Sequence, residues 1–64
     1  GGATSLIGLE GVAATDLRPS GSATINDKRV DVISSGAFII AGSTIIVTKH
    51  EGSRVVVELI ESES

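Results

Sequence analysis

The segment Asp16-Leu17-Arg18-Pro19-Ser20-Gly21 constrains the fold most, because it separates two strand-like stretches and favours a reversal of the chain. Pro19 fixes its own φ and lacks a backbone donor, and Gly21 tolerates positive φ. Ser20 can hydrogen-bond to the nearby backbone. We therefore predict a structural turn at Arg18, Pro19 and Gly21 that closes a first hairpin.

Length and composition predict one small all-β domain. A chain of 64 residues buries only about 60% of the surface that its unfolded form exposes, so its core is small. Val, Ile and Thr are abundant and Phe38 is the only aromatic residue, which predicts an aliphatic β-type core. Without cysteine there is neither a disulfide framework nor a thiolate zinc site.

Charge and hydropathy argue against two classes of partner. Eight acidic residues against five basic ones give a net charge of −3, which opposes binding to a phosphate backbone. The longest apolar run, residues 37–41, is far shorter than the roughly 20 residues of a membrane-spanning helix, so we expect this piece to be soluble. We expect residues 1–7 to be a linker or cloning remnant, 8–60 the domain and 61–64 a disordered acidic tail.

Apolar and polar residues alternate in short runs that predict five strands. The expected strands cover residues 11–15, 22–25, 29–32, 44–48 and 54–60, with turns at Asn26-Asp27 and at 50–53. Gly36 and Gly42 bracket the apolar run 37–41, which we expect to form one docked helical turn that plugs an end of the core. Three strands, a short crossover turn and two further strands match a small five-stranded OB-fold barrel. An SH3-like barrel needs the same number of strands and stays open as an alternative.

The ordered set of motifs resembles the C-terminal soluble domain of the NfeD-like family. That family's pattern runs Gly-x-x-Gly, a small-residue strand, Leu-Arg-Pro-x-Gly, a hairpin, and further glycines between Val/Ile-rich strands. The matching residues are Gly8 and Gly11, Thr15, Leu17-Arg18-Pro19-Ser20-Gly21, Arg29-Val30-Asp31-Val32, Gly36 with Phe38-Ile39, Gly42 ahead of Ile45 and Val47, and Gly52 ahead of Val55 and Val57. The chain departs from the pattern at Asn26-Asp27, where the family often has Gly, and at Leu9, which replaces a charged or polar residue.

The resemblance implies an OB-fold, protein-binding domain without catalytic activity or cofactor. It implies a membrane-associated parent protein whose membrane-spanning segment lies outside this chain, with the present domain on the cytoplasmic side. The implied partners are stomatin/prohibitin-like membrane scaffold proteins. Longer members of the family also carry an N-terminal ClpP-like serine protease domain, so an accessory or regulatory role beside such a protease is the main alternative.

Catalytic, metal and oligonucleotide sites find little support in the residues. His50 is the only imidazole, and a Ser-His-Asp triad would need Asp16, Asp27 or Asp31 beside it. No serine lies in a Gly-x-Ser-x-Gly elbow, and His50 adjoins a predicted turn, where we expect a solvated side chain. One His without Cys leaves only carboxylates to complete a metal site. An oligonucleotide-binding OB domain would need stacking aromatic residues and a basic groove.

Two further predictions concern side chains outside the core. Arg18 is expected to have a structural role, either in an ion pair with Asp16 or Asp31 or in hydrogen bonds to loop carbonyls. Strict strand alternation places four aliphatic residues on the outer faces, which are Ile33, Ile46, Val56 and Ile60. Scattered exposed apolar residues are normal on protein surfaces, and barrel curvature can cover some of them. The alternative is an interaction patch for a partner, for the membrane segment or for a second copy.

Overall fold

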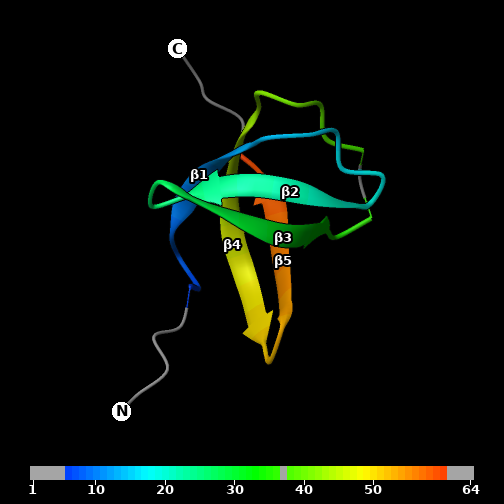
Figure 1. Ribbon diagram of the computed structural model, residues 1–64. Helices are drawn as coiled ribbons and strands as arrows, with labels where there is room; N and C mark the ends of the chain where they lie inside the picture. Colours follow the sequence, from blue (N-terminus) through cyan, green and yellow to red (C-terminus); the bar gives the residue numbers. More distant parts are fainter. Residues whose placement is uncertain (1–5, 37, 61–64) are drawn as a thin grey trace.

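The computed structural model describes residues 6–36 and 38–60, which form a closed barrel of five strands (Figure 1). The strands are β1 (Glu10–Ala13), β2 (Ser20–Ile25), β3 (Lys28–Ser34), β4 (Thr44–Glu51) and β5 (Arg54–Leu59). Their order around the barrel is β1-β2-β3-β5-β4. The predicted all-β barrel, with its crossover between the third and fourth strands, is confirmed. The predicted tail at 61–64 and the first five residues of the predicted linker lie outside the described residues.

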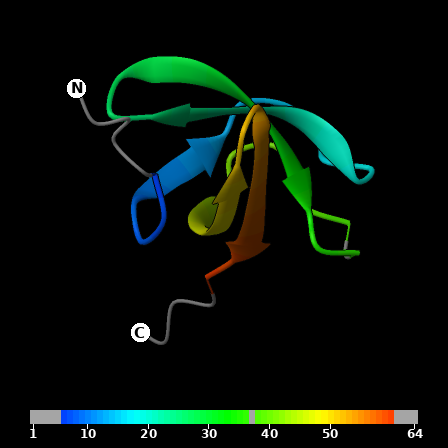
Figure 2. The same cartoon turned by 90° about the horizontal axis from the view of Figure 1, so that it is seen from below.

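Hairpins build most of the barrel, and one short parallel contact joins them. The β2–β3 and β4–β5 pairs are antiparallel, and β1 pairs antiparallel with both β2 and β4. Strands β3 and β5 pair in parallel through Ile33 with Val56 and Ser34 with Val57. Figure 2 shows the barrel from below, with the β2–β3 hairpin curving over β4 and β5. The predicted turn at Asn26-Asp27 is confirmed, since both residues have positive φ, as a two-residue hairpin loop requires.

Small aliphatic side chains from all five strands and two connections fill the core. The buried residues are Ala13, Leu17, Ala23, Ile25, Val32, Ile39, Ile45, Val47, Val55 and Val57. The alternation of buried and exposed residues along β4 and β5 follows the pleat, as the sequence predicts. Leu59 is 44% exposed because β5 ends there. The one aromatic side chain, Phe38, lies outside the core at 55% exposure.

The crossover between β3 and β4 plugs the barrel, but not as a helical turn. Ile39 forms an antiparallel bridge with Leu17, in which each N–H donates to the other residue's carbonyl at 2.8 and 3.2 Å. Both side chains are almost fully buried, at 1% and 0% exposure. The expected docked turn is therefore wrong in its conformation. One helical turn gains few hydrogen bonds for the residues it fixes, whereas an extended segment finds ready partners on Leu17.

The segment 16–21 also differs from the predicted turn. Strand β1 ends at Ala13 instead of Thr15, and β2 already begins at Ser20, so Gly21 is a strand residue. Its φ is not positive, and the conformational role predicted for it is wrong. A Cβ at Gly21 would stand 2.6 Å from Leu17 Cδ2 and 2.6 Å from Thr15 Oγ1. Glycine is needed at this position because the preceding chain packs directly on β2.

Replacing Gly21 with Ala is expected to destabilise the barrel by about 2 kcal/mol, since the added methyl would clash with Leu17, Thr15 and the Asp16 carbonyl. The measurement is urea unfolding followed by far-UV circular dichroism, because the chain contains neither Trp nor Tyr for fluorescence. Ser20→Ala is the matched control, because Ser20 is an exposed residue of the same strand and its loss should change stability by less than about 0.5 kcal/mol. Equal midpoints for the two variants would contradict the close-packing role of Gly21.

Candidate functional site

The four residues of the predicted patch lie next to one another around β5. Val56 stands opposite Ile33 of β3, and Glu58 stands opposite Ile46 of β4. Ile60 follows β5, and its N–H donates to the Thr44 carbonyl at 3.0 Å. Ile46 is thus a diagonal neighbour of both Val56 and Ile60, within reach of long side chains. We call Ile33, Ile46, Val56 and Ile60 the β5 surface; all four are half-buried.

Other apolar side chains are more exposed than those of the β5 surface, and the sequence patterns did not single them out. They are Ile7, Val12, Phe38, Ile40 and Leu59. Phe38 and Ile40 flank the buried Ile39, so strand alternation applied to the crossover would have placed both outside. The expectation of a helical turn concealed that signal. Val12 lies on β1 opposite Thr44 of β4, close to the β5 surface.

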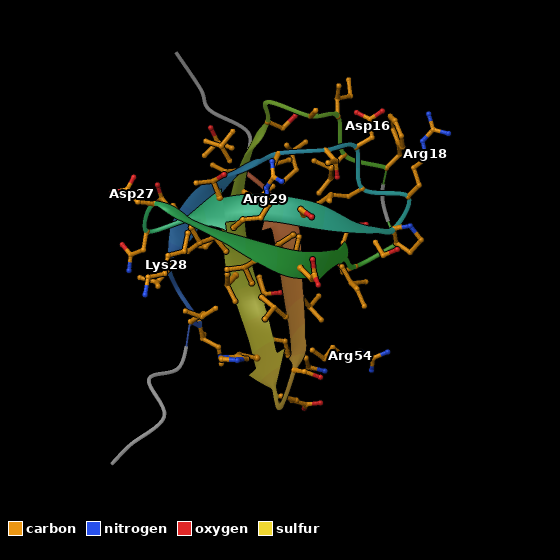
Figure 3. The ribbon with its side chains drawn as sticks, viewed as in Figure 1. Asp16, Arg18, Asp27, Lys28, Arg29 and Arg54 are labelled. Atoms are coloured by element: carbon orange, nitrogen blue, oxygen red, sulfur yellow. The ribbon has the colours of Figure 1, made fainter. Side chains whose placement is uncertain are left out.

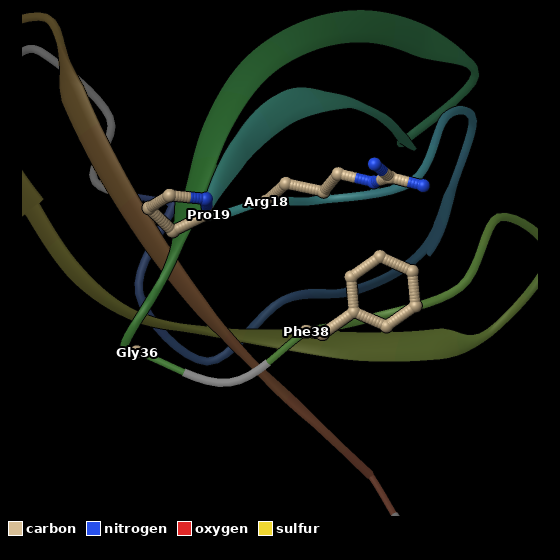
Figure 4. A pocket seen from close by; sticks show the side chains of 4 residues that line it. All are labelled: Arg18, Pro19, Gly36 and Phe38. Atoms are coloured by element: carbon tan, nitrogen blue, oxygen red, sulfur yellow. The ribbon is translucent and has the colours of Figure 1, made fainter.

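Arg18 and Asp16 form a corner beside Phe38; Figure 3 shows Asp16 with Arg18, and Figure 4 shows Arg18 with Phe38. The Arg18 guanidinium is 72% exposed and its Nη2 lies 3.8 Å from Asp16 Oδ2. Its Cζ lies 5.2 Å from the centre of the Phe38 ring, a cation–π distance. An ion pair this exposed adds about 0–1 kcal/mol of stability. Asp31 lies elsewhere, opposite Ser22 on the β2–β3 pair, so it is not the ion-pair partner of Arg18.

Asp16 has a structural role that the sequence did not indicate. Its Oδ1 accepts a hydrogen bond from the Ala41 backbone N–H at 2.8 Å. The carboxylate thereby ties the connection between β1 and β2 to the crossover between β3 and β4. A hydrogen bond to a charged group contributes about 1.5–3 kcal/mol when well shielded, and less at the 41% exposure of Asp16. Asp16, more than Arg18, holds this corner together.

Hollows on the surface of the described residues include two with distinct linings. One, of about 340 Å³, is lined by Arg18, Pro19, Gly36 and Phe38 (Figure 4). The other, of about 410 Å³, is lined by Ser20, Gly21, Ser22, Asp31, Val32, Ile33, Ser53 and Val55. This second lining offers hydroxyls and one carboxylate, with no aromatic ring and no cation. Single-stranded nucleic acid binds through stacking platforms and cationic grooves, so the second hollow does not fit it.

His50 holds the start of the domain. Strand β4 continues through Glu51, so His50 is a strand residue and not the predicted solvated neighbour of a turn. The imidazole is half-buried, and its Nδ1 accepts the Leu6 N–H at 3.0 Å. Leu6, placed in the linker from sequence, packs partly against the core. Within the described residues, no three His, Cys, Asp or Glu side chains gather as a group that could hold a metal.

Comparison with known proteins places this geometry in a family. Residues 3–58 match the family model described as the NfeD-like C-terminal, partner-binding domain. The chain belongs to the NfeD-like family. It is 47% identical over 57 residues to membrane protein NfeD1b of Bacillus subtilis (strain 168). That match covers 89% of this chain but only 13% of NfeD1b, so the chain spans a small part of that relative.

A solved structure supports the barrel architecture independently. The C-terminal domain of stomatin operon partner protein 1510-C from Pyrococcus horikoshii superposes with a TM-score of 0.83. The match covers 89% of this chain and 91% of that one at 22% sequence identity, so it speaks for the fold. No helix that is long and apolar enough to cross a membrane occurs among the described residues.

Asp16→Ala is expected to lower the free energy of unfolding by about 1 kcal/mol, because the Ala41 N–H loses its acceptor. Asp16→Asn keeps a side-chain oxygen and should retain most of that stability. Arg18→Lys keeps the charge but loses the planar group over Phe38, and should cost less than about 0.5 kcal/mol at so exposed a site. Urea unfolding gives the free energy of unfolding of each of the three variants. A larger loss of stability in Arg18→Lys than in Asp16→Ala would contradict the conclusion that Asp16 contributes more than Arg18.

Proposed function

We propose that this domain is a non-catalytic protein–protein interaction module of a membrane-anchored NfeD-like protein, and that its partners are stomatin/prohibitin-like membrane scaffold proteins. The observation that carries the proposal is the match of residues 3–58 to a domain described as partner-binding. The name of NfeD1b as a membrane protein supports a membrane-anchored parent. The name of the archaeal stomatin operon partner supports the class of partner.

The side chains of the barrel are consistent with binding and offer little for catalysis. The single imidazole has its Nδ1 engaged by the Leu6 N–H, and it has no carboxylate or hydroxyl partner among the described residues. The β5 surface instead gathers four aliphatic residues on the outside of a closed barrel. A protein interface needs such an apolar centre surrounded by polar groups. The membrane anchor would lie in parts of the parent outside this chain, and we place the domain on the cytoplasmic side.

An accessory or regulatory role beside a membrane-bound, ClpP-like serine protease domain is the second candidate. It is favoured by one observation, the 13% share of NfeD1b that the chain covers, which leaves ample length for other domains in such a parent. The two candidates predict different effects on proteolysis. If the domain is regulatory, adding it in trans to the protease domain should change the cleavage rate of a peptide substrate. If it is purely an interaction domain, that rate stays unchanged.

A double substitution, Ile46→Thr with Val56→Thr, is expected to weaken binding to a stomatin-like protein from the same organism by about tenfold or more, as the loss of central apolar contacts does. Isothermal titration calorimetry gives the affinity, and far-UV circular dichroism verifies that the variant is folded. The matched control is Phe38→Thr with Ile40→Thr, which removes two exposed apolar side chains from the crossover. Undiminished binding by a folded Ile46/Val56 variant would eliminate the β5 surface as the contact region.

A further inference from the structure

The outer face of β1, β4 and β5 carries an apolar residue between two carboxylates. Ile46 stands opposite Glu10 of β1 on one side and opposite Glu58 of β5 on the other. Opposed residues on one face of antiparallel strands have Cβ atoms about 5 Å apart. Both glutamates are exposed, and neither has an ion-pair partner within the part of the chain that the structure describes. Two unpaired negative charges therefore flank one aliphatic side chain.

The neighbouring row of the same face is uncharged. Val12 of β1 stands opposite Thr44 of β4, and the Ile60 N–H bonds to the Thr44 carbonyl on the other side. Ile46, Val12 and Ile60 thus surround Thr44 in an apolar stripe, with Glu10 and Glu58 on either side of Ile46. Val12 is 46% exposed, the most open of the three.

One basic residue of the described chain adjoins this face, and the others lie farther away. Lys49 of β4 stands opposite Val56, which makes it a diagonal neighbour of Glu58, but no ion pair joins it to either glutamate. Arg29 stands opposite Thr24, which itself stands opposite Val12, so two strand spacings separate Arg29 from Val12. Lys28 belongs to the tip of the β2–β3 hairpin, and Arg54 begins β5 at the far end of the β4–β5 hairpin. Figure 3 shows Arg18 and Arg54 pointing outward from opposite ends of the barrel. The two glutamates are therefore available to cations from outside.

The negative charges of Glu10 and Glu58 favour some binding partners of this face over others. A second copy docked through the same face would bring glutamates against glutamates, which is unfavourable for like charges. Anionic lipid and nucleic acid would meet the same two carboxylates and a chain of net charge −3. A segment with apolar residues along one side and Lys or Arg on both flanks satisfies the stripe and both glutamates together.

We propose that the face formed by Glu10, Val12, Ile46, Glu58 and Ile60 binds a basic amphipathic helix of a partner protein. This inference rests on the proposed partner-binding function and specifies where the contact lies. Two strand spacings put the glutamates about 10 Å apart, close to the diameter of a helix. Lys and Arg that flank the helix's apolar side can extend along their aliphatic stems to reach both carboxylates.

The test is an NMR titration of the ¹⁵N-labelled chain with a synthetic amphipathic helical peptide of about 18 residues, built from Leu and Lys. A matched peptide carries Glu in place of every Lys. The Lys peptide should shift amide signals in β1, β4 and the end of β5, with an affinity that falls as salt is added. The Glu peptide should leave these signals unchanged.

A pair of double variants makes the test specific to the face. Glu10→Gln with Glu58→Gln should weaken binding of the Lys peptide about tenfold, the effect of losing two partly shielded charge pairs. Asp31→Asn with Glu51→Gln removes the same number of charges from exposed positions elsewhere and should change the affinity by less than about twofold. An equal loss in both variants would show only a net-charge effect and overturn the proposal.

Other outcomes would assign the face to a different occupant and overturn the proposal equally. One is equal binding of the Lys and Glu peptides. Another is self-association of the free chain that becomes stronger in the Glu10/Glu58 variant. A third is binding to phosphatidylglycerol vesicles that shifts the same amide signals. The stomatin-like protein provides a separate readout. If the stomatin-like protein fails to bind the unmodified chain while the Lys peptide binds as expected, the proposed partner is wrong but the proposed binding face is supported. If the stomatin-like protein binds the Glu10/Glu58 variant with undiminished affinity, the proposed partner is supported but the proposed binding face is wrong.

Discussion

The barrel depends on β1, a strand of four residues that pairs with β2 on one side and β4 on the other. Without it, the two hairpins would share only the short parallel contact between β3 and β5. Gly11 makes the double pairing possible, because a Cβ at this position would collide with the Thr24 carbonyl and with Ile25. Closure also removes the free strand edges along which small sheets aggregate.

The connections between β1 and β2 and between β3 and β4 close one end of the barrel. Leu17 and Ile39 bridge each other and bury both side chains, which seals an end of the barrel with aliphatic groups alone. Asp16 reinforces that seal through the Ala41 N–H. Because the interior is filled by the strands and this seal, side chains on the outer faces of β3, β4 and β5 are free to serve binding.

Sequence patterns predicted the strands well where alternation was strict, as in β4 and β5, and where the turn chemistry was distinctive, as at Asn26-Asp27. They failed at Gly21, because a glycine required for close packing looks the same as one required for positive φ. They failed again at the crossover, because periodicity cannot distinguish a helical turn from an extended segment in so short an apolar run.

The candidate site was only half visible for a related reason. Alternation within a single strand is enough to predict on which side of the sheet a side chain lies. It therefore identified the outward residues Ile33, Ile46, Val56 and Ile60. The carboxylates beside Ile46 come from two other strands, Glu10 from β1 and Glu58 from β5. Their proximity depends on the pairing register, which no pattern within a single strand specifies.

The attachment of Leu6 to His50 also determines how the domain would bear a load. Leu6 lies at the end of β4 that carries His50, whereas Ile60 is bonded to Thr44 at the opposite end. Strands β1 and β5 run in the same direction on either side of β4. A pull on Leu6 in one direction and on Ile60 in the other would slide these strands along β4. It would stretch many ladder hydrogen bonds at once instead of peeling them one by one, so the barrel is oriented to resist tension between its two ends.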